Sequence, residues 1–208
     1  MKSSGVVHLR NFKFISVLRD NIGIVVFTLL FTLGVLIGTL LFSSDFFIDE
    51  ANSIVEIFSN LRSSGTYLKI FSATFVFSFA FLFAVFLFGT SLLGIAFVPF
   101  IVAIRGVFSG LLLSGIYTRY ALDGITLNML TLIPSTIICV LVLIKSATES
   151  LNFSYSLGKL AINEERRASS LNIKYVIKRF CLYILITVIG CLFEALLAVV
   201  FKKFFVLG

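Results

Sequence analysis

Few residues in this chain are of the types that perform catalytic chemistry, and their spacing does not suit it. The only histidine is His8, so no second imidazole can complete a zinc site or a Ser-His-Asp set. Cys139, Cys181 and Cys191 lack CxxC spacing and lie in apolar runs, where thiols pack as small apolar groups. No GxxxxGK[ST] phosphate-binding loop occurs. We therefore expect no catalytic residues, no metal, no cofactor and no disulfide.

Two charged residues inside apolar runs are the remaining candidates. Arg105 is the one charge in FVPFIVAIRGVFSGLLLSGI, residues 97–116, and Glu194 is the one acid in residues 181–201. Charges at such positions are costly in hydrocarbon and mark functional sites or membrane boundaries. We expect Arg105 at the cytoplasmic boundary, with its side chain reaching the headgroups. The alternative places it deep in the membrane, where it would need Glu194 as its partner.

The elements that position these charges follow from composition. Apolar residues make up 59% of the 208 residues and charged residues only 13%, which is more apolar surface than one soluble core can bury. A helix needs about 20 apolar residues to cross a bilayer. We therefore predict an all-α polytopic integral membrane protein.

Five membrane spans are predicted from the uncharged runs. Their residue ranges are 22–43, 70–89, 95–118, 125–145 and 180–201. The first run is longer than the apolar part of a signal peptide, and no small-x-small cleavage site follows, so we expect an uncleaved anchor. Gly89, Gly94 and Pro99 favour a re-entrant or kinked segment near 89–105.

Orientation follows from the basic residues that flank the spans. The N-terminal tail carries Lys2, Arg10, Lys13 and Arg19, and the expected cytoplasmic loop 146–179 is also basic, whereas Asp45, Asp49, Glu50 and Glu56 follow the first span. This pattern predicts a cytoplasmic N-terminus and an external C-terminus, although Lys202 and Lys203 weigh against it. The net charge of +7 is then a topological bias with attraction to membrane lipids, and we expect no nucleic-acid binding.

An amphipathic segment is expected outside the membrane at residues 45–62. Ile54, Val55 and Phe58 lie on its apolar stripe, with acidic residues opposite. The stripe either rests on the lipid interface as a connector or docks a partner protein.

Small residues at intervals of four predict where helices meet. Gly34 and Gly38 form one GxxxG pair, and Gly106, Gly110 and Ser114 form a longer small face. Such faces let helix backbones approach closely in lipid. We expect packing within the chain, and contact with another chain, including a second copy, is the alternative.

Three stretches resemble the stage II sporulation protein M family. They are LGVLIGTLLF in the first span, AIRGVFSGLLLSGI in the third and TLIPSTIICVLVLIKSATESLNFS in the fourth. The resemblance implies a multi-pass protein of the bacterial inner membrane, found at the septum in the mother-cell membrane during engulfment. There it would anchor a peptidoglycan-degrading complex with the sporulation proteins D and P. It implies a scaffold and not an enzyme.

The competing interpretation is transport. Intramembrane Arg105 and Glu194, a broken helix near Pro99 and a charged cytoplasmic loop also fit the permease subunit of an ATP-driven exporter. Such a permease would require a separate ATPase partner.

Overall fold

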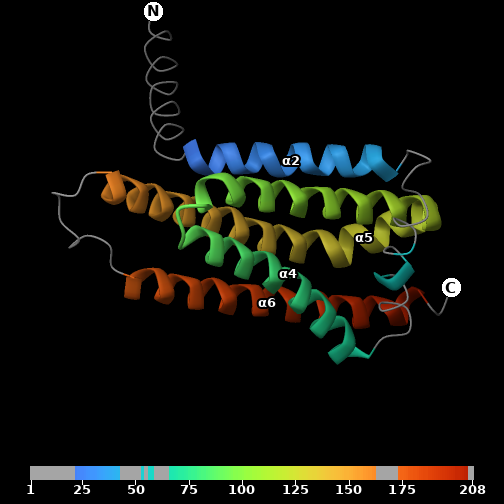
Figure 1. The fold of residues 1–208 in the computed structure, drawn as a ribbon. Helices are drawn as coiled ribbons and strands as arrows, with labels where there is room; N and C mark the ends of the chain where they lie inside the picture. The colour runs from blue at the N-terminus through green and yellow to red at the C-terminus, as the bar shows by residue number, and fades with distance from the viewer. Residues whose placement is uncertain (1–21, 43–52, 54–55, 59–65, 163–172, 206–208) are drawn as a thin grey trace, which may run out of the picture.

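The computed structural model describes residues 22–42, 53, 56–58, 66–162 and 173–205. These residues form no strand, which agrees with the predicted all-α class. Four continuous helices carry the fold (Figure 1): α2 Ile22–Phe42, α4 Tyr67–Gly89, α5 Gly94–Ile162 and α6 Ile173–Phe205.

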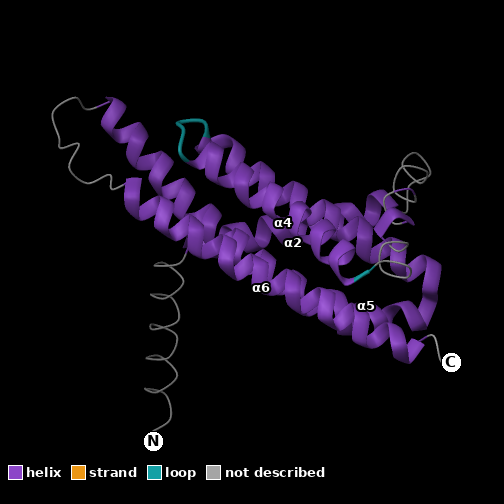
Figure 2. Ribbon diagram, turned by 90° about the horizontal axis from the view of Figure 1, so that it is seen from below, coloured by secondary structure: helices purple, strands orange, loops and turns teal. Residues whose placement is uncertain are grey.

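Five stretches of these helices are long and apolar enough to cross a membrane, as predicted. They are Ile22–Phe42, Tyr67–Gly89, Gly94–Thr118, Ile133–Gly158 and Val176–Val200. Two of them belong to α5, which runs along the bundle, turns at the end of the bundle where α6 ends, and doubles back (Figures 1 and 2). The two arms of α5 therefore lie antiparallel, side by side.

The helix that contains the fourth predicted span continues further along the chain than predicted. The sequence suggested a span at 125–145 and a loop at 146–179, but α5 remains helical to Ile162 and α6 begins at Ile173. The reason is a second small-residue ladder, spaced like the glycines, in which Ser146, Ser150 and Ser154 are all buried. A sequence with many hydroxyls and few charges thus packs as a helix rather than forming a polar loop.

The ladder packs against the connection between α4 and α5. A Cβ built on Gly89 would lie 2.3 Å from the Ser150 Cβ, and the Ser154 hydroxyl donates to the Ser91 carbonyl over 2.7 Å. The connection is a tight turn over residues 90–93, after which α5 continues without interruption through Pro99. No re-entrant segment therefore occurs at 95–104, since this stretch is helical throughout and Pro99 removes only the one backbone hydrogen bond that its own N–H would have donated.

The two arms of α5 form the centre of the bundle. Among the described residues, α2 packs mainly on α5, whereas α4 packs on both α5 and α6, and α2 and α4 do not pack extensively on one another. The main core cluster includes Leu82, Val85, Val98 and Val102, all almost fully buried. Large apolar side chains elsewhere on the helices point outward, as expected for surfaces that face lipid.

Candidate functional site: a cavity around Arg105

The two glycine pairs predicted from the sequence meet one another across the α2–α5 contact. Gly34 faces Gly106, and a Cβ built on either would lie 3.0–3.1 Å from the other's Cα. A Cβ on Gly38 or on Gly110 would lie 2.2 Å from a carbonyl oxygen of the opposite helix. These four glycines form the glycine seam, in which the backbones of α2 and α5 touch directly and no larger residue fits. The seam is a contact within the chain.

Ser114 continues this ladder in sequence but takes a lesser part in the packing. It is half-buried, and its carbonyl accepts a hydrogen bond from the Thr118 hydroxyl over 3.0 Å. The neighbouring Ile116 packs instead against Phe42 at the end of α2. The close backbone contact therefore lies at Gly106 and Gly110.

Arg105 lies halfway along the Gly94–Thr118 arm rather than at its boundary. Eleven residues separate it from Gly94, which is about 16 Å along the helix axis at a rise of 1.5 Å per residue. Only 7% of its surface is exposed. The expected boundary position rested on a re-entrant or interfacial course of residues 95–104, and these residues are helical instead. The helix therefore favours the deep position, and the depth of Arg105 in the membrane stays a prediction.

The guanidinium of Arg105 stacks on aromatic rings of α4. Its central carbon lies 4.5 Å from the Phe77 ring centroid and 5.4 Å from that of Phe81. Cation–π contacts contribute about 0.5–2 kcal/mol. An arginine at the centre of a membrane helix costs at least about 2.5–3.5 kcal/mol, so stacking offsets only part of this cost.

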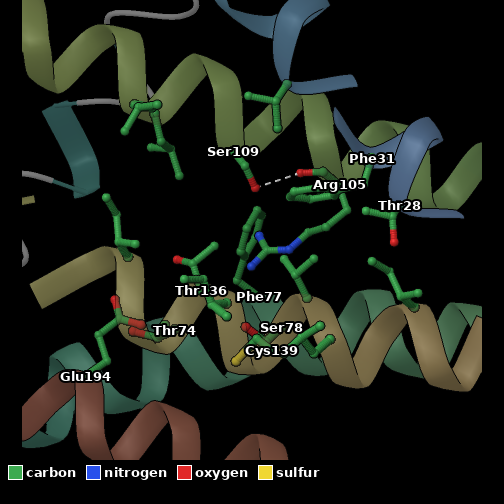
Figure 3. A pocket seen from close by; sticks show the side chains of 18 of the residues that line it. Thr28, Phe31, Thr74, Phe77, Ser78, Arg105, Ser109, Thr136, Cys139 and Glu194 are labelled. Atoms are coloured by element: carbon green, nitrogen blue, oxygen red, sulfur yellow. Dashed lines mark hydrogen bonds between the residues drawn. The ribbon is translucent and has the colours of Figure 1, made fainter. Parts of the chain in front are cut away.

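Within the part of the chain that the structure describes, the guanidinium has no hydrogen-bond acceptor and no carboxylate within 4.0 Å. The direct ion pair with Glu194, which the alternative of a deep Arg105 required, is therefore not formed. Glu194 is only 2% exposed, and one of its oxygens accepts a hydrogen bond of 2.6 Å from the Ser135 hydroxyl. Figure 3 shows Arg105 and Glu194 on opposite sides of one cavity.

This cavity has a volume of about 380 Å³ and is lined by α2, α4, α6 and both arms of α5. Most of its wall is apolar, but five hydroxyl groups also face it (Figure 3): Thr28, Thr74, Ser78, Ser109 and Thr136. The Thr28, Thr74 and Ser109 hydroxyls donate to carbonyls of their own helices over 2.7–2.9 Å. The Ser78 oxygen is buried and has no hydrogen-bond partner among the described residues.

The apolar stripe expected outside the membrane is only partly described. Phe58 makes an edge-to-face contact with Phe77, with ring centroids 5.7 Å apart, and it lines the Arg105 cavity. Its ring therefore contributes to the bundle and does not face away from it. Ile54 and Val55 lie outside the described residues.

The residues that sequence reasoning missed are the polar and aromatic side chains around Arg105. Thr74 and Ser78 lie four apart on α4, and Phe77 and Phe81 follow the same spacing on the same helix. That periodicity was visible in the sequence, but nothing there indicated that α4 faces Arg105. Of the cysteines, Cys139 lines the cavity, Cys191 is buried and Cys181 is exposed, and all three are free thiols.

Among the described residues, no group of three or more His, Cys, Asp or Glu side chains could hold a metal ion. A family model described as stage II sporulation protein M matches residues 26–198. No curated protein and no solved structure matches the chain. The family match begins in the first membrane-length helix and extends into the last.

Proposed function

The chain belongs to the stage II sporulation protein M family, and on this premise we propose that it is a non-catalytic membrane scaffold that recruits partner proteins. The observation that carries the proposal is the family match, which includes residues from all five membrane-length helices. The proposed partners are the peptidoglycan-degrading proteins of engulfment, sporulation proteins D and P. The proposed location is the mother-cell membrane at the septum.

The packing supports a scaffold because it fixes the helices relative to one another. At the glycine seam, backbone meets backbone without intervening side chains, so α2 cannot slide on α5 without collisions. At the other end of the bundle, the Ser154 hydroxyl ties α5 to the α4–α5 turn. A rigid bundle of this kind presents its external segments in a defined arrangement, which is what a platform for partners requires.

A permease subunit is the second candidate, and the Arg105 cavity is the observation that favours it. Polar groups that line an intramembrane cavity are typical of substrate pathways. Alternating access requires helices on two sides of such a cavity to separate in turn. Here the glycine seam fastens α2, one wall of the cavity, to α5, another wall, which favours the scaffold.

The identity of the proteins that bind the chain distinguishes the scaffold from the permease subunit. The full chain would be captured from native membranes after mild crosslinking, and the recovered proteins would be identified by mass spectrometry. The scaffold predicts cell-wall hydrolases among the specific partners, whereas stoichiometric recovery of an ATPase without hydrolases would contradict it. A Gly110→Leu variant, in which the glycine seam cannot form, controls for proteins that bind misfolded chain.

A further inference from the structure

We propose that the Arg105 cavity is a binding site for an amphiphile with one anionic oxygen group, a carboxylate or a phosphate, carried on an acyl chain. The anionic group meets the Arg105 guanidinium, and the apolar chain occupies the remainder of the cavity. The proposal goes beyond the scaffold function and does not depend on it.

The need for an anion follows from Arg105 itself. A guanidinium carries five N–H donors in a planar fork that matches carboxylate and phosphate oxygens. Its contacts with Phe77 and Phe81 involve the ring faces and provide no oxygen acceptor. Since Arg105 is 93% buried and no described carboxylate lies within 4.0 Å, a charged ligand would supply an anion that the described residues do not.

The apolar side chains that line most of the cavity indicate that the rest of the ligand is apolar. Ligand sites are typically cavities of about 300–1,000 Å³ that are mainly apolar and contain a few placed polar groups. At about 380 Å³ the cavity is at the lower end of this range, and Val35, Leu112 and Ile137 are among its apolar lining. It accommodates a slender chain but not a transmembrane helix, whose diameter is about 10 Å.

A route from the cavity to the bilayer is inferred from the sparse contact between α2 and α4 among the described residues. Thr28 of α2 and Thr74 of α4 both line it, yet α2 and α4 do not pack extensively on one another and are joined through α5. An amphiphile can therefore enter sideways between these two helices. Glu194 on the opposite wall opposes a second negative charge, which favours a singly charged group.

Two pairs of probes test the proposal on the purified full chain in a neutral detergent. Oleate is compared with oleyl alcohol, and phosphatidylglycerol with diacylglycerol, so that each pair differs in its charged group. The readout is the shift in the temperature of unfolding as the probe is titrated. We expect a saturable stabilisation by at least one anionic probe, and the pair that responds distinguishes a carboxylate from a phosphate source. No stabilisation by either anionic probe overturns the proposal.

Matched variants locate the binding. Arg105→Gln removes the cation, and Ser109→Leu fills the cavity while keeping the cation; each should weaken the response by at least about tenfold. Lys178→Gln removes an exposed positive charge elsewhere on α6 and should leave the response unchanged. If Arg105→Gln does not fold, the response of Ser109→Leu alone still tests whether the probe binds in the cavity.

Two results overturn the proposal in favour of general charge attraction. One is an equal response in wild type and Ser109→Leu, and the other is a response that is lost only in Lys178→Gln. Loss of a co-purifying membrane protein in Arg105→Gln, without any probe response, assigns Arg105 to a partner's acidic helix and also overturns it.

Discussion

At the scale of single residues, the two intramembrane charges define the interior of the bundle. Arg105 and Glu194 were recognisable in the sequence because each interrupts an apolar run. The positions of these two charges relative to one another could not be recognised in the sequence, since they depend on which faces of α4 and α6 turn toward α5. Phe77 and Phe81 stabilise the cation by stacking, and Ser135 stabilises the carboxylate by hydrogen bonding, so each charge has its own local support.

The shared cavity predicts an electrostatic coupling without direct contact. Arg105→Gln and Glu194→Gln should not act independently on stability: the double change should cost less than the sum of the two single changes by about 0.5–3 kcal/mol. The reason is that either single change removes the attraction between the two opposite charges across the cavity, so the second change has none of this attraction left to remove. A double-mutant cycle on the free energy of unfolding in detergent measures this. If the changes in the free energy of unfolding are strictly additive, the two charges do not interact across the cavity.

At the scale of elements, the sequence predicted which helix faces pack but not where every helix ends. The GxxxG spacing correctly indicated close contacts at Gly34, Gly38, Gly106 and Gly110, because only glycine allows carbonyl oxygens to approach so closely. The helical course of α5 beyond residue 145 does not follow from the sequence, since Ser146, Ser150 and Ser154 are typical of a polar loop. In the bundle all three serines are buried: Ser150 is small enough to lie against Gly89, and the Ser154 hydroxyl donates to the Ser91 carbonyl.

The glycine seam predicts a strong position dependence of glycine substitution within α5. Gly110→Ala should destabilise by about 1–3 kcal/mol, because the new Cβ would lie 2.2 Å from the Val35 carbonyl oxygen. Gly158→Ala makes the same change where the nearest atom is 3.6 Å away, and it should be neutral or stabilising by up to about 1 kcal/mol. Unfolding in detergent followed by circular dichroism compares the two. Equal effects would show that the seam does not limit stability.

A second comparison separates the seam from the charge beside it. Gly110→Leu should reduce the recovery of monodisperse protein far more than Arg105→Lys, since lysine keeps the positive charge and the long apolar stem. Size-exclusion chromatography after expression at matched levels measures this. If Arg105→Lys reduces the recovery of monodisperse protein more than Gly110→Leu does, the planar guanidinium group matters more for the stability of the bundle than the glycine seam.

At the scale of the whole molecule, the number of spans and the family followed from the sequence, because both depend on long apolar runs and their order. The positions of the spans relative to one another required the fold, since α5 supplies two antiparallel arms within one continuous helix. Orientation is predicted from charge alone: basic residues near the N-terminus and in the segment after Gly158 favour the cytoplasmic side.

Labelling with an impermeant thiol reagent tests this orientation. Cysteines introduced at Ser64 and Ser169 should react from opposite sides, with Ser64→Cys labelled from outside the cell. The exposed Cys181 is first replaced by serine to remove its background. Labelling of Ser169→Cys from outside would invert the topology.

The recruitment of wall hydrolases through the external segment tests the scaffold most directly. Because Phe58 packs on Phe77 inside the bundle, changing it would confuse folding with docking. The informative variant is Ile54→Ser with Val55→Ser, and its matched control is Leu68→Ser, an apolar side chain that is 70% exposed at the start of α4. Capture from native membranes is quantified at equal amounts of folded protein. The account predicts that the double change reduces hydrolase recovery by at least about tenfold while Leu68→Ser does not, and equal recovery from all three proteins would contradict it.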